Sequence, residues 1–150
     1  MLPRTARKFP DRPALSYQLL SVPTDKSLTL TWRAFHDQVC QCANLFRALK
    51  LSETDVVALV LPNTPETAVA TIGGMVSGIV NPVNPLLEPE QLGAILRETK
   101  AKGVVTLKAF PKTDIAQKTA EAVRHAPGVH TVLEIDLSRY LASPKAGSCR

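Results

Sequence analysis

Helical and strand-like hydrophobic patterns alternate along most of the chain. Residues 32–50 place apolar side chains at three- and four-residue steps, which is the spacing of a helix with one buried face. Residues 56–61 instead form a continuous apolar run, which is typical of a strand buried on both faces of a parallel sheet. The same reasoning predicts the remaining elements, with helices over 66–77, 90–100 and 114–126 and strands over 79–83, 104–107 and 131–135.

The first thirty residues follow a different pattern. Residues 13–20 and 27–31 alternate apolar and polar side chains, and the sequence Pro23-Thr24-Asp25-Lys26 between them has turn chemistry. They predict an antiparallel hairpin. Residues 1–12 are expected to form an irregular lead-in, and residues 143–150 a polar tail.

The predicted fold class is therefore α/β, with an N-terminal antiparallel hairpin followed by the alternating helices and strands of a mostly parallel sheet. We divide the chain into a basic lead-in over 1–12, one domain over 13–141 and a polar tail over 142–150. A chain of 150 residues is long enough to bury a core of its own.

Several residues mark the predicted helix ends. Thr31 is suited to cap the first helix, and Asn63 or Thr64 to cap the second, where a proline follows at the first helical position. Gly78 is expected to end that second helix, and Gly103 to form the turn before the next strand.

The net charge of +5 is carried by the ends of the chain. Residues 1–12 hold four basic side chains against one acidic, whereas residues 13–111 are balanced. A nucleic-acid-binding domain usually gathers Lys and Arg on a folded face with aromatic side chains for stacking, so we expect no nucleic-acid partner. The basic lead-in is compatible with weak contact to an anionic membrane surface, and a solvated segment is the alternative.

No transmembrane segment is expected, because the clean apolar run over 68–80 is too short to span a bilayer. Three cysteines, Cys40, Cys42 and Cys149, without a secretory signal favour a reducing, cytoplasmic setting. Cys40 and Cys42 lie two residues apart on a predicted helix and do not face each other, so free thiols are expected rather than a metal site.

Ligands of open α/β sheets bind beyond the carboxyl ends of the strands, which here are residues 61–64, 81–85 and 107–108. None of these segments contains a glycine-rich phosphate loop. Asn63 and Thr64 lie where an anion or a helix cap is expected, and the cap is the favoured interpretation.

Other polar residues have ordinary structural explanations. Glu88 and Glu90 lie at a helix start, where acidic side chains are common. His36 flanks the apolar stripe of its helix, and His125 and His130 flank a predicted turn. We therefore predict no catalytic, cofactor-binding or metal-binding residue in this chain.

Four segments, taken in order, resemble the N-terminal part of one enzyme family. They are Phe9-Pro10-Asp11-Arg12-Pro13-Ala14-Leu15, Leu30-Thr31-Trp32-Arg33-Ala34-Phe35, Asp55-Val56-Val57-Ala58-Leu59-Val60-Leu61-Pro62-Asn63 and Gly78-Ile79-Val80-Asn81-Pro82-Val83-Asn84-Pro85. Their order and spacing are similar to those of the AMP-forming acyl-CoA synthetases, the adenylate-forming (AMP-binding) ligases. The Asn-Pro-Val-Asn-Pro form is most similar to the fatty- and aryl-acyl-CoA ligase branch. Ala34 departs from the family, which usually has there a glutamate that completes a capping box.

The resemblance implies ATP-dependent activation of a carboxylic acid to an acyl-adenylate, followed by transfer to coenzyme A. In the family this chemistry uses ATP, magnesium and a Ser/Thr/Gly-rich loop that ends in Pro-Lys-Gly. Ser143-Pro144-Lys145-Ala146-Gly147 lacks the Thr-Ser-Gly-Thr-Thr-Gly run whose amides would cradle phosphate. No catalytic residue is therefore carried over, and none of these cofactors is expected for this chain alone.

The favoured hypothesis is an N-terminal fragment of an AMP-forming fatty- or aryl-acid CoA ligase that is catalytically inactive by itself. The alternative is a non-catalytic interaction or dimerisation module, which self-associates or complements the rest of a split synthetase. A partial parallel sheet favours that alternative, because it leaves strand edges and an apolar face uncovered. The carboxylic acid substrate is implied for the family and not for this chain alone.

Overall fold

The computed structural model describes residues 1–19 and 27–140 of the 150-residue chain. Its elements are α1 (Leu2–Lys8), β1 (Pro13–Tyr17), β2 (Leu28–Thr31), α2 (Trp32–Ala48), β3 (Val56–Val60), α3 (Pro65–Ser77), β4 (Ile79–Pro82), α4 (Pro89–Glu98), β5 (Ala101–Leu107), α5 (Ile115–Arg124), β6 (Thr131–Ile135) and a 3₁₀ turn, η1 (Leu137–Tyr140). Strands β1 and β2 pair antiparallel, and the other four form a parallel sheet in the order β4-β3-β5-β6. This confirms the predicted α/β class.

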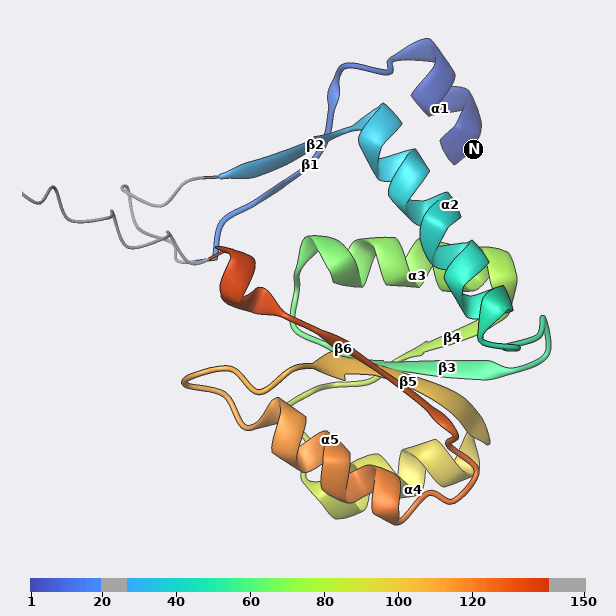
Figure 1. Cartoon of the computed structure of the whole chain (residues 1–150), viewed down its shortest axis with the longest axis vertical. Coiled ribbons are helices and arrows are strands. Elements are labelled where there is room, and N and C mark those ends of the chain that lie inside the picture. Colours follow the sequence, from blue (N-terminus) through green and yellow to red (C-terminus); the bar gives the residue numbers. More distant parts are fainter. Residues whose placement is uncertain (20–26, 141–150) are drawn as a thin grey trace, which may run out of the picture.

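Helices cover both faces of the parallel sheet. Strand β4 lies on one side of β3 in the sheet, and β5 and β6 lie on its other side. The connection from β3 to β4 and the connection from β4 to β5 therefore run in opposite directions across the sheet. Since such crossovers are right-handed, the reversal places α3 on one face and α4 and α5 on the opposite face. Figure 1 shows α2 and α3 above the sheet and α4 and α5 below it, with the hairpin and α1 beyond α2.

The continuous apolar run over 56–61 becomes the central strand of the sheet. Val57, Ala58, Leu59 and Val60 of β3 are all almost fully buried, because helices lie over both of their faces. Phe46 of α2 fills one side of this core, and Leu92 and Leu96 of α4 fill the other. The strand therefore needs no alternation of polar and apolar residues.

Helix α3 packs unusually close to β4 because its inner face is made of small residues. A Cβ on Gly74 would lie 2.2 Å from Cγ2 of Val80, and one on Gly78 would lie 2.7 Å from the carbonyl oxygen of Ser52. Gly78 does end the helix, as predicted, but its φ of −176° is extended. Glycine is required there for the close approach of two backbone segments, and not for a left-handed turn.

A buried hydroxyl pair joins the sheet to α5. The Thr106 hydroxyl of β5 donates to the Thr119 hydroxyl of α5 over 3.1 Å, and both side chains are almost fully buried. We expect Thr119→Val to destabilise the chain by about 1–3 kcal/mol, because it leaves the Thr106 hydroxyl buried without a partner. The double change to valine should be less destabilising than the single one. Urea unfolding of both variants measures this, and a double variant that is as destabilised as Thr119→Val or more so would contradict it.

The predicted helix caps are largely confirmed. The Thr31 hydroxyl accepts from the Ala34 amide over 3.2 Å, and the Thr64 hydroxyl accepts from the Thr67 amide over 3.3 Å. Thr64, rather than Asn63, is thus the cap of α3.

Two expectations about local structure are wrong, and one element was not predicted. Residues 2–8 form the short helix α1 instead of an irregular lead-in. Ala6 is the one buried residue of this helix, so the sequence has no apolar stripe from which the helix could be predicted. Gly103 lies inside β5 rather than in a turn, because the strand begins at Ala101. The turn η1 was not predicted, since it is a single turn without periodicity.

Other sequence predictions fall outside the described residues. The turn Pro23–Lys26, the strand end at Leu20, Cys149 and the polar tail 143–150 belong to this group. The remaining element boundaries lie within a few residues of their predicted positions.

Candidate functional site

The carboxyl ends of β3 and β5 form the topological switch point of the parallel sheet. The connections that leave these neighbouring strands run in opposite directions, and open α/β sheets bind ligands at such a crevice. A pocket of about 390 Å³ opens here. Its lining is mainly apolar and consists of Leu19, Pro62, Leu107, Phe110, Pro111, Lys112, Thr113, Ile115 and Leu137. Two of the three predicted strand ends, 61–64 and 107–108, therefore meet at this site, whereas 81–85 follows the outer strand β4.

The polar groups around this crevice mostly bind one another. Lys108 Nζ lies 3.2 Å from Oδ2 of Asp136, and so ties the end of β5 to the end of β6. Lys112 has a φ of 69°, which is uncommon for a residue with a side chain. Among residues 1–19 and 27–140, no acid, histidine or cysteine that would act as base or nucleophile lines this pocket.

The carboxylate of Asp136 has a strongly lowered pKa, of about 2, because the Ser138 hydroxyl and amide donate to it and Lys108 lies beside it. A carboxyl whose pKa is depressed by folding stabilises the fold above its unfolded pKa and loses that contribution as the pH falls through the folded value. We therefore expect Asp136 to stay ionised down to about pH 2. An NMR pH titration of its carboxyl carbon measures this, and a midpoint near 4 would contradict it.

The start of α3 is occupied by groups of the chain itself. Thr64 is buried and caps the helix, while Asn63 is exposed. Glu66, in the first turn, accepts from the Tyr140 hydroxyl and pairs with Arg139 of η1. A carboxylate already lies at this positive helix end, so the geometry supports the capping interpretation rather than an anion site.

The Glu66–Arg139–Tyr140 cluster was not predicted from the sequence. Glu66 lies more than 70 residues before Arg139 and Tyr140 in the sequence, and only the folded sheet brings η1 back over α3. Burial raises the pKa of Tyr140, whose ring also packs edge-on against Tyr17 with 5.2 Å between centroids. The cluster ties the end of the described chain to the hairpin and to α3.

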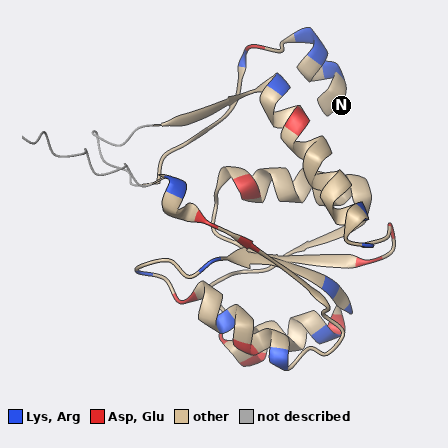
Figure 2. Ribbon diagram, viewed as in Figure 1, with Lys and Arg blue, Asp and Glu red and all other residues tan. Residues whose placement is uncertain are grey.

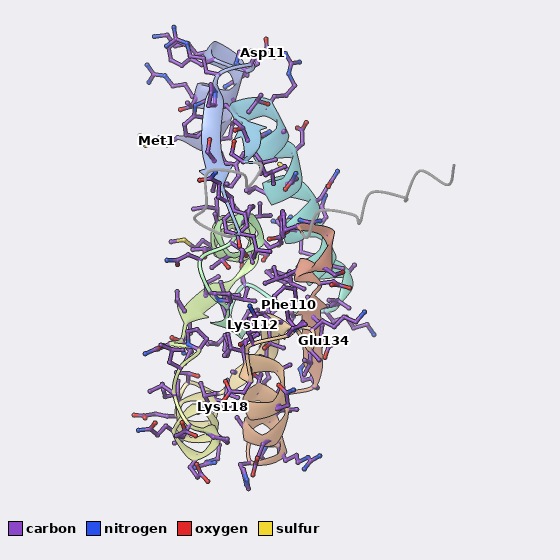
Figure 3. All side chains as sticks on the ribbon, turned by 90° about the vertical axis from the view of Figure 1, so that its left-hand side faces the viewer. Met1, Asp11, Phe110, Lys112, Lys118 and Glu134 are labelled. Atoms are coloured by element: carbon purple, nitrogen blue, oxygen red, sulfur yellow. The ribbon has the colours of Figure 1, made fainter. Side chains whose placement is uncertain are left out.

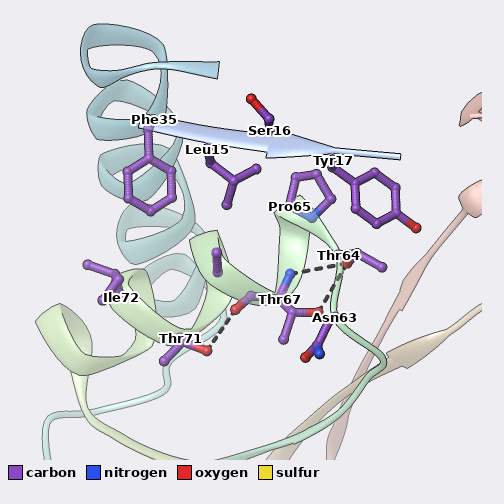
Figure 4. A pocket seen from close by; sticks show the side chains of 11 residues that line it. Leu15, Ser16, Tyr17, Phe35, Asn63, Thr64, Pro65, Thr67, Thr71 and Ile72 are labelled. Atoms are coloured by element: carbon purple, nitrogen blue, oxygen red, sulfur yellow. Dashed lines mark hydrogen bonds between the residues drawn. The ribbon is translucent and has the colours of Figure 1, made fainter. Parts of the chain in front are cut away.

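A second pocket, of about 540 Å³, lies between the hairpin and α3. Figure 4 shows Leu15 and Phe35 on one side of it and Thr71 and Ile72 of α3 on the other. Its hydroxyl groups have partners within the chain: Thr67 donates to the Pro62 carbonyl over 2.6 Å, and Thr71 to the Thr67 carbonyl over 2.7 Å. The walls are therefore effectively apolar.

The other candidate side chains lie apart from both pockets. His125 and His130 are exposed near the amino ends of the strands, as the predicted turn required. Glu88 is exposed and pairs with Lys118 of α5 over 2.8 Å, and Glu90 is exposed in the first turn of α4. These positions agree with structural roles.

His36 is only partly exposed. Its ring contacts Cys40 Sγ over 3.7 Å and lies 3.6 Å from a carboxylate oxygen of Asp37, all on α2. Cys40 and Cys42 are free thiols, and burial raises the pKa of Cys42. Within residues 1–19 and 27–140, no three His, Cys, Asp or Glu side chains gather in a way that would hold a metal ion.

Basic side chains gather at one end of the elongated molecule. Figure 2 shows them on α1 and the segment that follows it, and Figure 3 places Met1 and Asp11 at the end opposite Lys118. Arg12 lies over the ring of Phe9, and Arg33 pairs with Asp11 over 3.3 Å. Among the described residues, no helix has the length and apolar character needed to cross a membrane.

Comparison with known proteins shows which enzymes this chain resembles. The family model described as "AMP-binding enzyme" matches residues 2–148. The marinolic acid–CoA ligase of Pseudoalteromonas sp. (strain SANK 73390) is 32% identical over 120 residues, which cover 80% of this chain and 18% of that protein. The long-chain-fatty-acid–CoA ligase of Bacillus subtilis (strain 168) is 32% identical over 150 residues, which cover 97% of this chain and 24% of that protein.

Solved structures show the same fold. The anthranilate CoA ligase AuaEII in complex with anthranoyl-AMP superposes with a TM-score of 0.74 at 18% identity, over 94% of this chain and 25% of that one. A fatty acyl CoA synthetase of Mycobacterium tuberculosis gives a TM-score of 0.72 at 21% identity, over 93% of this chain and 27% of that one. The chain thus spans only about a fifth to a quarter of the length of these relatives. With a family model that matches nearly every residue, the chain belongs to the AMP-binding enzymes, the family of the adenylate-forming CoA ligases.

Proposed function

We propose that the chain serves as the N-terminal scaffold of an AMP-forming carboxylate–CoA ligase and has no catalytic turnover by itself. The observation that carries this proposal is the contrast in coverage: the family model matches residues 2–148, while the chain spans about a quarter of the structural relatives. In this proposal the hairpin and the parallel sheet support the segments that bind ATP, magnesium and coenzyme A.

The composition of the switch-point crevice supports a scaffold role. Its walls are mainly apolar, and the charged groups at the strand ends, Lys108 and Asp136, are paired with each other. The 150-residue sequence contains no Thr-Ser-Gly-Thr-Thr-Gly run, so it supplies no phosphate-binding loop of the family type.

We propose a fatty or aryl acid as the substrate of the whole ligase, to which the B. subtilis and anthranilate relatives lend support through their own names. The free thiols Cys40 and Cys42 are consistent with a reducing, cytoplasmic setting, which we retain as part of the proposal.

A segment exchange tests the scaffold role. Residues 1–150 replace the matching segment of the B. subtilis long-chain-fatty-acid–CoA ligase, and acid-dependent pyrophosphate release is measured with ATP and magnesium. We expect the exchanged enzyme to keep measurable activity, and the same ligase carrying an unrelated α/β domain of equal length to lose it. A folded exchange product with no activity would contradict the proposal.

The second candidate function is an interaction or dimerisation module. The observation that favours it is the exposure of Met75, Val76 and Ile79 around α3 and β4, since large apolar side chains gathered on a surface mark interaction sites. Size-exclusion chromatography with light scattering tests it: a concentration-dependent dimer supports this candidate, and a strict monomer at high concentration contradicts it.

A further inference from the structure

Helix α3 presents apolar side chains on two opposite faces. Its inner face, which includes Val69, Ala70, Gly73 and Gly74, is buried against the sheet and α2. The outer positions follow the same helical spacing, and we name them with the first residue of β4 as the α3–β4 face: Ala68, Thr71, Ile72, Met75, Val76 and Ile79. After Glu66 the helix carries no charged residue. A helix that is apolar all round is normally buried on all sides.

The exposure of this face is considerable. Met75 is 65% exposed, Val76 56% and Ile79 49%. The surfaces of α4 and α5 instead carry many charged side chains, as Figure 2 shows, whereas α3 and β4 carry almost none. Residues 67–87 contain no charged side chain at all. Among the described residues, the other α-helices that face solvent carry several charged side chains, whereas α3 carries only Glu66.

The neighbouring pocket extends the face. Leu15 of β1 and Phe35 of α2 stand across from Ile72, and the hydroxyls of Thr67 and Thr71 are bonded inside the chain. An occupant of this groove therefore meets apolar walls. Strand β4 is also the outer strand of a parallel sheet, a class of sheet that is normally covered.

We propose that the α3–β4 face is the surface on which the remaining polypeptide of the ligase docks, with an apolar element against Ile72, Met75 and Ile79. This rests on the proposed scaffold function. The docking partner is inferred from the share of each relative that this chain matches. About three quarters of each structural relative lies outside that part. That polypeptide must contact this part, and among the described elements α3 and β4 offer a face with no charged side chain of their own after Glu66, bordered by Arg47 of α2, which donates to the Val76 carbonyl over 3.3 Å.

Two single substitutions test the face. Met75→Lys and Ile79→Lys each place a charge on it, while Val132→Lys places the same charge on the exposed side of β6, where Val132 is 46% exposed. All three positions are exposed, so we expect the isolated variants to melt within about 2 °C of the parent chain. A variant that melts much lower is replaced by Met75→Gln, which removes apolar surface without adding charge.

The binding partner in the test is the B. subtilis long-chain-fatty-acid–CoA ligase without the segment that matches this chain, co-expressed with tagged residues 1–150. We expect the parent chain and Val132→Lys to retain this polypeptide on affinity resin, and Met75→Lys and Ile79→Lys to reduce the retained amount by about tenfold, which corresponds to about 1.4 kcal/mol. Equal retention by all variants overturns the proposal, as does no retention by the parent chain.

Further readouts separate the docking face from the scaffold function and from self-association. Pyrophosphate release by the retained complex reports the function, while retention reports the face. Retention that depends on Met75 without pyrophosphate release leaves the face standing and contradicts the function. Pyrophosphate release by the complex together with unchanged retention of Met75→Lys supports the scaffold function and contradicts the docking face. A dimer of the isolated chain that Met75→Lys dissociates overturns the proposed occupant, because a second copy then covers the face.

Discussion

Replacement of Phe46 by alanine is expected to destabilise the chain by about 3–5 kcal/mol, the largest effect of any single substitution considered. Phe46 of α2 is 1% exposed and belongs to the hydrophobic core, and its ring atom Cε2 lies 3.3 Å from the position of a Cβ on Gly74 of α3. Because the small residues of α3 leave no long side chain to collapse into the space, the cavity should stay open. For a chain of this size, such a loss is a large part of the total free energy of unfolding.

The neighbouring residue supplies a matched control for this prediction. Leu45 is on the same helix and 47% exposed, so Leu45→Ala should change the free energy of unfolding by less than about 0.5–1 kcal/mol. Urea unfolding followed by circular dichroism compares the free energies of unfolding of the two variants, both of which replace a residue of α2 by alanine. If both variants lose the same free energy, Phe46 is not the centre of the core.

The second large effect is expected for Gly74→Ala. The added Cβ would lie 2.2 Å from Cγ2 of Val80 and 3.3 Å from Cε2 of Phe46, so either the Val80 side chain or α3 itself must shift. Overpacking of this kind costs about 1–3 kcal/mol, although alanine favours helix over glycine. The sign of the effect therefore distinguishes close packing from helix propensity.

Two further variants complete the Gly74 experiment. Gly128→Ala is the control, since the nearest atom to a Cβ there is the Ala101 carbonyl oxygen at 3.8 Å. Val80→Ala in the Gly74→Ala background removes the clashing methyl group and should recover part of the loss. Thermal unfolding in which Gly74→Ala is as stable as the parent would show that α3 does not approach β4 so closely.

Local hydrophobic spacing was sufficient to predict most of this fold. The stripe that contains Val39, Ala43 and Phe46 and the continuous run of β3 both have the burial that their patterns imply. Prediction failed where the signal was short. Helix α1 buries only Ala6, so it leaves no apolar stripe in the sequence. The start of β5 was missed because a glycine inside a strand, such as Gly103, looks the same in sequence as a glycine in a turn.

Less of the candidate site than of the fold could be predicted from the sequence. The sequence identified residues 61–64, 81–85 and 107–108 as carboxyl strand ends, where ligands of open α/β sheets bind, but not which of these ends are neighbours. The order β4-β3-β5-β6, which makes the ends of β3 and β5 the switch point, depends on long-range pairing that no local pattern specifies. The same holds for the contact of Tyr140 with Glu66.

The central claim is that this chain is a non-catalytic scaffold of an AMP-forming ligase. The most direct measurement is pyrophosphate release by purified residues 1–150 with ATP, magnesium, coenzyme A and a panel of fatty and aryl acids, with the B. subtilis long-chain-fatty-acid–CoA ligase as the positive control. The account predicts a rate equal to that without protein. Acid-dependent pyrophosphate release in proportion to the concentration of this chain would contradict it.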